Sequence, residues 1–219
     1  MMRRILAVLL FICIPITLSA AAESYLSAAL GWSYDTNSFS SPYPVGYDPE
    51  DGYPNGGSYL KRHNIILSVD YDLYFSEGSR IGLSIGGIYA MPFTATRITP
   101  VLSGGNIIHE ESNALPDMLS SLFFSIGPVF RYSWDIFTIS LPIRFSFGTY
   151  DWFISGIELG ASLSPSFQID ITETISIRAS LLYDAHFMKF LFNSSHVYDS
   201  GYIMLNIGAS VGCVFDFGG

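Results

Sequence analysis

The feature that most constrains this chain is an alternation of apolar and polar residues that recurs along most of its length. In the last stretch, every second residue from Ile203 to Phe217 is apolar or aromatic, while most residues between them are polar or small. Successive side chains of a β-strand point to opposite faces of a sheet, so the pattern predicts strands and not helices. Seven earlier stretches alternate in the same way: 24–34, 62–75, 80–91, 121–132, 136–147, 155–169 and 174–187.

Charged residues occupy only one of the two faces that the alternation defines. The apolar face of these eight strands carries none, and the opposite face carries seven that we assign to one polar network: Asp70, Asp72, Arg131, Arg144, Glu158, Arg178 and Asp184. A soluble barrel would place its apolar face inward. The sequence therefore predicts an all-β, eight-stranded antiparallel transmembrane up-and-down β-barrel, with lipid outside and polar groups inside.

Composition supports membrane-spanning strands over a membrane-spanning helix. Hydrophobic residues make up 49% of the chain and charged residues only 13%, against an average charged content of about 25%. The longest uncharged runs after the first segment are still only sixteen residues, rich in Gly and Ser. A helical span needs roughly 18 or more apolar residues. Short turns at 76–79, 133–135 and 170–173 also alternate with longer links at 35–61, 92–120, 148–154 and 188–200, as in outer-membrane barrels.

Residues 1–22 have the pattern of a cleaved signal peptide, which leaves 23–219 as the barrel domain. Arg3 and Arg4 precede an apolar core, and small residues follow it just before Glu23. A retained membrane anchor is the alternative interpretation. Without the two arginines, 8 basic residues remain against 19 acidic ones, a net charge of −11. This charge argues against a nucleic-acid partner.

The last strand resembles the assembly signal of outer-membrane barrels, in which a polar residue, a glycine and two aromatic residues stand at fixed spacing. Ser210, Gly212, Phe215 and Phe217 fill these places, although Gly218 and Gly219 follow the final aromatic. By size and loop plan, the chain is similar to the small OmpW, OmpX and OmpA-barrel families. The resemblance implies a multi-pass barrel in the bacterial outer membrane that contacts outer-membrane lipid and the barrel-insertion machinery.

Three prolines within predicted strands suggest a function. Pro128, Pro142 and Pro165 each lack the N–H for a ladder hydrogen bond. They lie either at bulges or strand ends, or at a lateral opening like that of OmpW-type barrels. The second interpretation implies a passive route for small hydrophobic molecules. The rival function is a surface-binding, adhesin-like barrel whose extracellular loops contact host molecules.

The polar residues of the lumen also leave two interpretations open. Folding residues 144–158 about Asp151 places Arg144 opposite Glu158, so we expect an ion pair there. The network is either a structural one or a gate and binding floor. Catalysis is not expected, because the chain lacks the His-x-Ser motif of lipid A deacylase barrels, and Ser195-His196 with Asp199-Ser200 has ordinary loop composition. The spacing of residues predicts no metal site and no cofactor.

Overall fold

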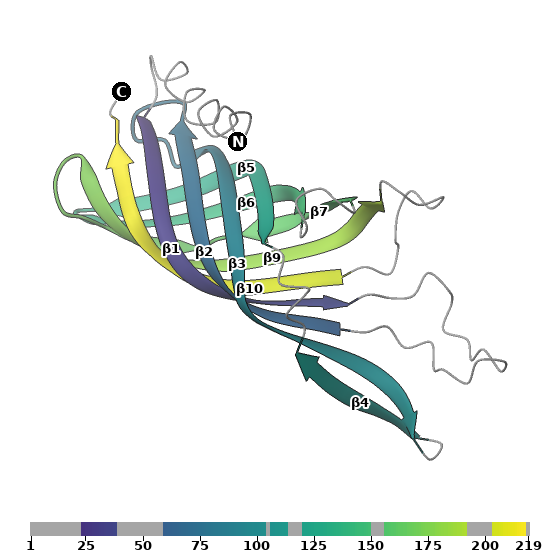
Figure 1. Ribbon diagram of the computed structural model, residues 1–219. Coiled ribbons are helices and arrows are strands. Elements are labelled where there is room, and N and C mark those ends of the chain that lie inside the picture. Colours follow the sequence, from purple (N-terminus) through teal and green to yellow (C-terminus); the bar gives the residue numbers. More distant parts are fainter. Residues whose placement is uncertain are drawn as a thin grey trace, which may run out of the picture.

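The computed structural model describes residues 23–38, 59–103, 106–113, 120–149, 156–191 and 203–217. These residues form ten strands of one antiparallel sheet (Figure 1). The strands are β1 (Glu23–Ser38), β2 (Tyr59–Tyr74), β3 (Ile81–Ser103), β4 (Asn106–Asn113), β5 (Ser121–Trp134), β6 (Phe137–Thr149), β7 (Gly156–Leu163), β8 (Ser166–Asp170), β9 (Ile175–Leu191) and β10 (Ile203–Asp216). Among the described residues, no helix is long and apolar enough to cross a membrane.

The sheet closes into an eight-stranded barrel, which confirms the predicted fold class. The last strand, β10, pairs with β1 over fourteen residues, from Tyr25 opposite Asp216 to Ser38 opposite Ile203. The short strands β7 and β8 both pair with β6 and β9, so they are two halves of one barrel strand. The strand β4 pairs only with β3 and lies off the barrel path.

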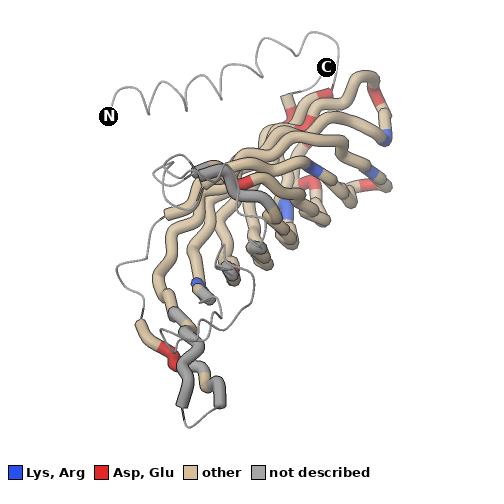
Figure 2. The backbone as a smooth tube through the Cα atoms, turned by 90° about the vertical axis from the view of Figure 1, so that its right-hand side faces the viewer, with Lys and Arg blue, Asp and Glu red and all other residues tan. Residues whose placement is uncertain are grey.

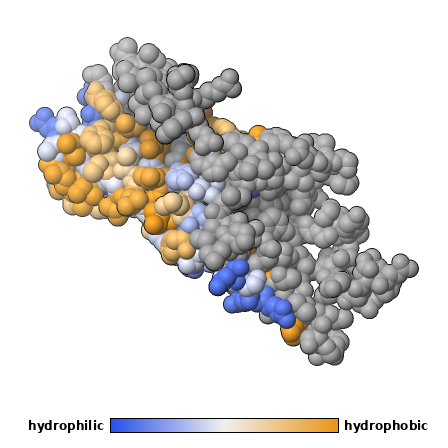
Figure 3. Space-filling model, viewed as in Figure 1, coloured by the Kyte–Doolittle hydropathy of each residue, from blue (hydrophilic) through white to orange (hydrophobic). Residues whose placement is uncertain are grey.

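The side chains have the inverted arrangement that the alternation predicts. Along β6, Ile143 and Phe145 are 46% and 49% exposed, while Arg144 between them is 5% exposed. The other strands repeat this pattern, with large apolar side chains outward and Ser, Asn, Asp, Glu and Arg inward. Figure 3 shows the apolar side chains gathered in a band on one face of the barrel. Hydrocarbon is the environment that suits such a surface.

The two ends of the barrel differ. The short turns at 75–80, 135–136 and 171–174 lie at the end where β10 finishes beside the start of β1. Charged residues gather toward this end (Figure 2). At the other end β3 continues to Ser103 and returns as β4, so part of the predicted 92–120 loop is a hairpin.

The alternation predicted a strand over 80–91, but the strand continues through Pro92 and Pro100 to Ser103. Pro92 lies beside a bulge at Phe93, where the β2–β3 register shifts between His63 and Asn64. Pro100 lies in the projecting hairpin opposite His109. Proline is tolerated at both positions. Pro92 lies next to a local irregularity of the ladder, and Pro100 lies outside the barrel wall.

Candidate functional site

An ion pair stacked on two tyrosines lies at the short-turn end of the lumen. Arg131 on β5 pairs with Glu23 at the start of β1, and its guanidinium carbon lies 3.9 Å from the ring centre of Tyr74. Tyr25 stacks on the same guanidinium at 5.2 Å, and its hydroxyl donates to Glu23 over 3.0 Å. Glu23 also accepts from the backbone N–H of Gly78. The cluster therefore ties β1, β2, β5 and the first short turn together.

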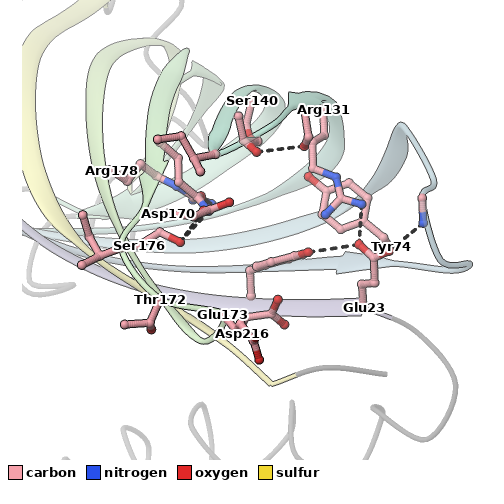
Figure 4. Close-up of a pocket in the computed structure, with 17 residues that line it drawn as sticks. Glu23, Tyr74, Arg131, Ser140, Asp170, Thr172, Glu173, Ser176, Arg178 and Asp216 are labelled. Atoms are coloured by element: carbon pink, nitrogen blue, oxygen red, sulfur yellow. Dashed lines mark hydrogen bonds and ion pairs between the residues drawn. The ribbon is translucent and has the colours of Figure 1, made fainter.

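This cluster borders a cavity of about 530 Å³ that is open at the short-turn end (Figure 4). The carboxylates of Asp170, Glu173 and Asp216 also line the cavity, and Arg178 lies at its inner side. Most of the lining residues are polar, and with Glu23 they bring four carboxylates and two arginines to the cavity. It forms a vestibule whose continuation into the barrel is blocked by the side chains described next.

Two arginines with carboxylate partners fill the middle of the lumen. Arg178 donates to Asp72 over 3.1 Å and to Gln168 over 3.2 Å, and Ser84 donates to the other oxygen of Asp72 over 2.6 Å. Arg144 pairs with Asp70, on the opposite side of the lumen. These bonds link β2, β3, β8 and β9 in one set and β2 and β6 in the other.

Gly86 makes room for the second pair. A Cβ atom at this position would collide with Arg144 and Asp70. The glycine on β3 thus leaves room for the close approach of the two charged side chains, and its backbone conformation is ordinary.

The expected ion pair between Arg144 and Glu158 is wrong. Arg144 lies opposite Ser162 on β7, and Glu158 lies opposite Gly148, so the centre of this hairpin is displaced from Asp151. Register decides cross-strand neighbours, and a small error in a hairpin centre separates two residues by several positions. Arg144 therefore reaches across the lumen to Asp70 instead.

An apolar layer crosses the lumen beyond these ion pairs. Ile66, Ile88, Ala90 and Leu182 point inward and pack together, with exposures of 1–9%. The alternation predicted mostly polar or small residues on this face and did not reveal the layer. An eight-stranded barrel is just wide enough for its side chains to fill the interior. A void beside Arg144 and Leu182 holds only about 20 Å³, close to the space of one water molecule.

A further buried ion pair lies beyond the apolar layer, and sequence reasoning missed it. Arg62 donates to both oxygens of Asp35, over 3.0 and 3.1 Å, and to Ser121 over 3.0 Å. Asn64 donates to Asp35 over 2.7 Å. Asp35 and Arg62 are only 2% and 1% exposed. The signal was present, since Asp35 follows Ser33 on the inward face, but residue 35 was assigned to a loop.

Three neighbouring strands bring a serine, a histidine and a glutamate together in the same half of the lumen. His186 Nε2 lies 2.9 Å from the hydroxyl oxygen of Ser146, and its Nδ1 lies 3.7 Å from Glu158. The second distance is too long for a hydrogen bond. All three side chains are at most 1% exposed, and neither the vestibule nor the small void borders Ser146. The geometry is that of a packed polar cluster, with Phe123 edge-on against the imidazole at 4.5 Å.

The three strand prolines lie on neighbouring strands at one level of the wall. The β5–β6 pairing runs from Ile126 opposite Phe145 to Val129 opposite Pro142 and omits Pro128. The pairing of β6 with the next strand stops at Leu163 and resumes at Ser166, on either side of Pro165.

Two backbone hydrogen bonds remain in this gap. Ser164 N donates to Pro142 O over 3.3 Å, and Leu181 N donates to Pro165 O over 2.9 Å. The prolines do not lie at bulges, because the register shifts fall at Phe93 and Phe187 instead. Pro165 lies between two strand ends, and the wall has fewer ladder bonds there than elsewhere.

An apolar groove of about 850 Å³ lies on the outer face of the barrel beside this gap. Pro165 and Phe167 line it from one side, and Leu30 and Trp32 from the other. The groove and the small inner void share four lining residues: Ser166, Ser180, Leu181 and Ser210. A single layer of backbone and mostly small side chains therefore separates the outer surface from the lumen at this point.

The sequence matches no family model and no curated protein. The structure of outer membrane protein AlkL in DMPC bilayers is similar over 90% of both chains, with a TM-score of 0.51 and 11% identity. The fold is that of a small outer-membrane β-barrel. OprG from Pseudomonas aeruginosa aligns with 91% of this chain and 98% of its own, at TM-score 0.48 and 10% identity. Neisserial surface protein A aligns with 86% of this chain and 95% of its own, with a TM-score of 0.44 and 9% identity.

The seven predicted network residues of this barrel all lie on its inward face, but at three different levels. Arg131 lies at the vestibule, the two aspartates of β2 pair with Arg144 and Arg178 at mid-height, and Glu158 and Asp184 lie in the far half beside His186. Within the described ranges, no group of three His, Cys, Asp or Glu side chains is arranged to hold a metal ion.

The four residues of the assembly-signal pattern end the barrel. Ser210 and Gly212 face inward on β10, and Phe215 and Phe217 are 40% and 61% exposed on the outer face. The predicted signal peptide and the cluster at Ser195, His196, Asp199 and Ser200 lie outside the described residues.

Proposed function

We propose that this chain is a bacterial outer-membrane barrel that admits small hydrophobic molecules passively and releases them sideways through its wall, as in OmpW-type barrels. The observation that carries the proposal is the weakened wall at Pro165. Ladder bonds are missing there on both sides of β6, and the same four residues border the lumen and an apolar groove on the outer face.

The filled lumen favours a lateral route over an axial one. The ion pairs of Arg144 and Arg178 and the apolar layer around Ile66 occupy successive levels of the interior. A solute moving along the axis would have to separate buried charges from their partners, which is costly. A solute that leaves through the wall at Pro165 does not pass the pairs of Arg144 and Arg178, although it does pass the pair of Arg62 and Asp35. The exit itself displaces mostly small side chains and few backbone hydrogen bonds.

Uptake of radiolabelled octane tests this function. The protein is inserted into vesicles that carry lipopolysaccharide in the outer leaflet and a cyclodextrin acceptor inside. We expect the protein to speed uptake over empty vesicles, and Pro165→Val or Pro128→Val, which restores an N–H donor to the gap, to slow it. Pro92→Ala changes a strand proline far from the gap and serves as the matched control. Equal uptake with and without the protein, or full activity of Pro165→Val, would contradict the proposal.

One observation favours the rival function, surface binding. The β3–β4 hairpin extends past the ends of β1 and β2 (Figure 1), and Ile108, Glu110 and Glu111 on β4 are exposed. An exposed strand edge can pair with an extended segment of another protein. Binding to purified host matrix that is lost on deleting residues 99–110, with the barrel still folded, would support this function instead.

A further inference from the structure

Small residues line the barrel wall along the groove on its outer face. A row of small inward residues crosses five neighbouring strands, each directly opposite the next: Gly31, Ser210, Ser180, Ser166 and Ser140. On the outer face the same strands carry Ala209 and Ala179 at the middle of the groove. Small residues on both faces make the wall thin along this row.

Large side chains form the rims of the groove. Leu30, Trp32, Phe167, Leu181 and Val211 are between 40% and 59% exposed and stand around the alanines. The strands that carry the groove are also strongly bent, as β1, β2 and β10 show near mid-length in Figure 1. A Cβ atom at Gly31 would collide with the backbone of Ala209 and Ser210, so β1 and β10 can approach this closely only with glycine there.

The groove needs an occupant, because an unfilled concavity in a condensed apolar medium forfeits van der Waals contacts. Its volume of about 850 Å³ falls in the range of small-ligand pockets, roughly 300–1,000 Å³. A second copy of this chain would have to bring a convex apolar segment into the groove, because a two-fold dimer that sets groove against groove leaves a void between the two copies.

We propose that the groove holds one acyl chain of a membrane lipid as a resident ligand. A flexible hydrocarbon chain fits an irregular apolar concavity, and the lining offers almost no polar partner for anything else. The inference rests on the proposed membrane location but not on solute transport. Bulk lipid is as apolar as the groove, so the preference comes from packing and not from the hydrophobic effect. We therefore expect selectivity of several-fold for the resident chain over bulk lipid.

Quenching of Trp32 measures this selectivity directly. The variant Trp134→Phe/Trp152→Phe leaves Trp32 as the only tryptophan, and it lies on the rim of the groove. The protein is inserted into vesicles that contain increasing fractions of phosphatidylethanolamine brominated on its acyl chains. A resident chain produces more quenching at low brominated fraction than random lipid contact allows.

A variant that fills the groove with a side chain tests whether the excess quenching comes from a lipid chain in the groove. Ala179→Phe, made in the Trp32-only protein, should reduce quenching to the level of random contact. Ala161→Phe places the same ring on an equally outward position of β7 away from the groove, and should leave the excess quenching intact. If Ala179→Phe does not insert, Ala209→Leu, which adds less volume, replaces it.

The outcomes separate this inference from the proposed function. Vesicle flotation and far-UV circular dichroism report insertion for every variant. The resident chain is overturned if Trp32 quenching in the inserted protein follows the bulk lipid fraction, or if it is unchanged in the groove-filling variant. Either result leaves the proposed uptake of hydrophobic molecules standing. A protein that does not enter vesicles overturns both proposals.

Discussion

The buried pair of Arg62 and Asp35 gives the strongest quantitative prediction for stability. Arg62→Met keeps most of the side-chain volume but removes the two bonds to Asp35 and the bond to Ser121. Asp35, at 2% exposure, then keeps the hydrogen bond from Asn64 but loses its charged partner. Breaking a buried pair by removing one partner costs about 3–5 kcal/mol, because the other charge stays buried.

The double variant Arg62→Met/Asp35→Asn tests that explanation. It leaves no buried charge, so we expect it to be more stable than Arg62→Met alone, with a coupling of roughly 1–3 kcal/mol. Equilibrium urea unfolding in lipid vesicles, followed by circular dichroism, measures both values. Arg80→Met, which removes an exposed arginine stacked on Tyr132, should change the free energy of unfolding by no more than about 1 kcal/mol.

Two results would refute this reasoning. The first is a loss below about 1 kcal/mol for Arg62→Met, which would mean that water reaches Asp35 and the pair is not buried. The second is strict additivity of the two substitutions, which would mean that the charges do not interact.

Three further predictions concern other parts of the barrel. Gly86→Ala should destabilise the protein by about 1–3 kcal/mol in the same urea assay, because the new methyl group collides with the pair of Arg144 and Asp70; an unchanged midpoint would show that the pair can move aside. Arg131→Gln should cost about 1–2 kcal/mol, since it removes an ion pair and stacking on two rings, and limited proteolysis should then cut the short-turn end sooner. Cys213, exposed on the outer face, should react in vesicles with an apolar maleimide and not with a charged one; labelling by the charged reagent would place this face in water.

The strands could be predicted from the sequence because period-two alternation is a local property. The apolar outer face and the inward position of all seven charged residues follow from the same alternation. The hairpin beyond Tyr89 could not be predicted, because Pro92 and Pro100 look like ends of a strand when the bulge at Phe93 is unknown. The break between β7 and β8 was signalled only by Pro165.

The partners of the charged residues depend on distances that the sequence does not contain. Arg144 pairs with Asp70 across the lumen, between strands that are not neighbours. Register and barrel shape together set this contact, and a hairpin centre displaced from Asp151 was enough to give the wrong partner. Ile88 and Leu182 were missed for a simpler reason, since an apolar residue on the inward face weakens the alternation instead of extending it.

The seam between β1 and β10 sets the timing of assembly. β1 is synthesised before β10 but pairs with it, so the backbone groups of Tyr25 on that side have no partner until Asp216 has been synthesised. A nascent chain without β10 would expose two unpaired strand edges to hydrocarbon, where each backbone amide without a hydrogen bond costs free energy. Translation must therefore finish before the chain can enter the bilayer, and something must shelter it from aggregation in the interval.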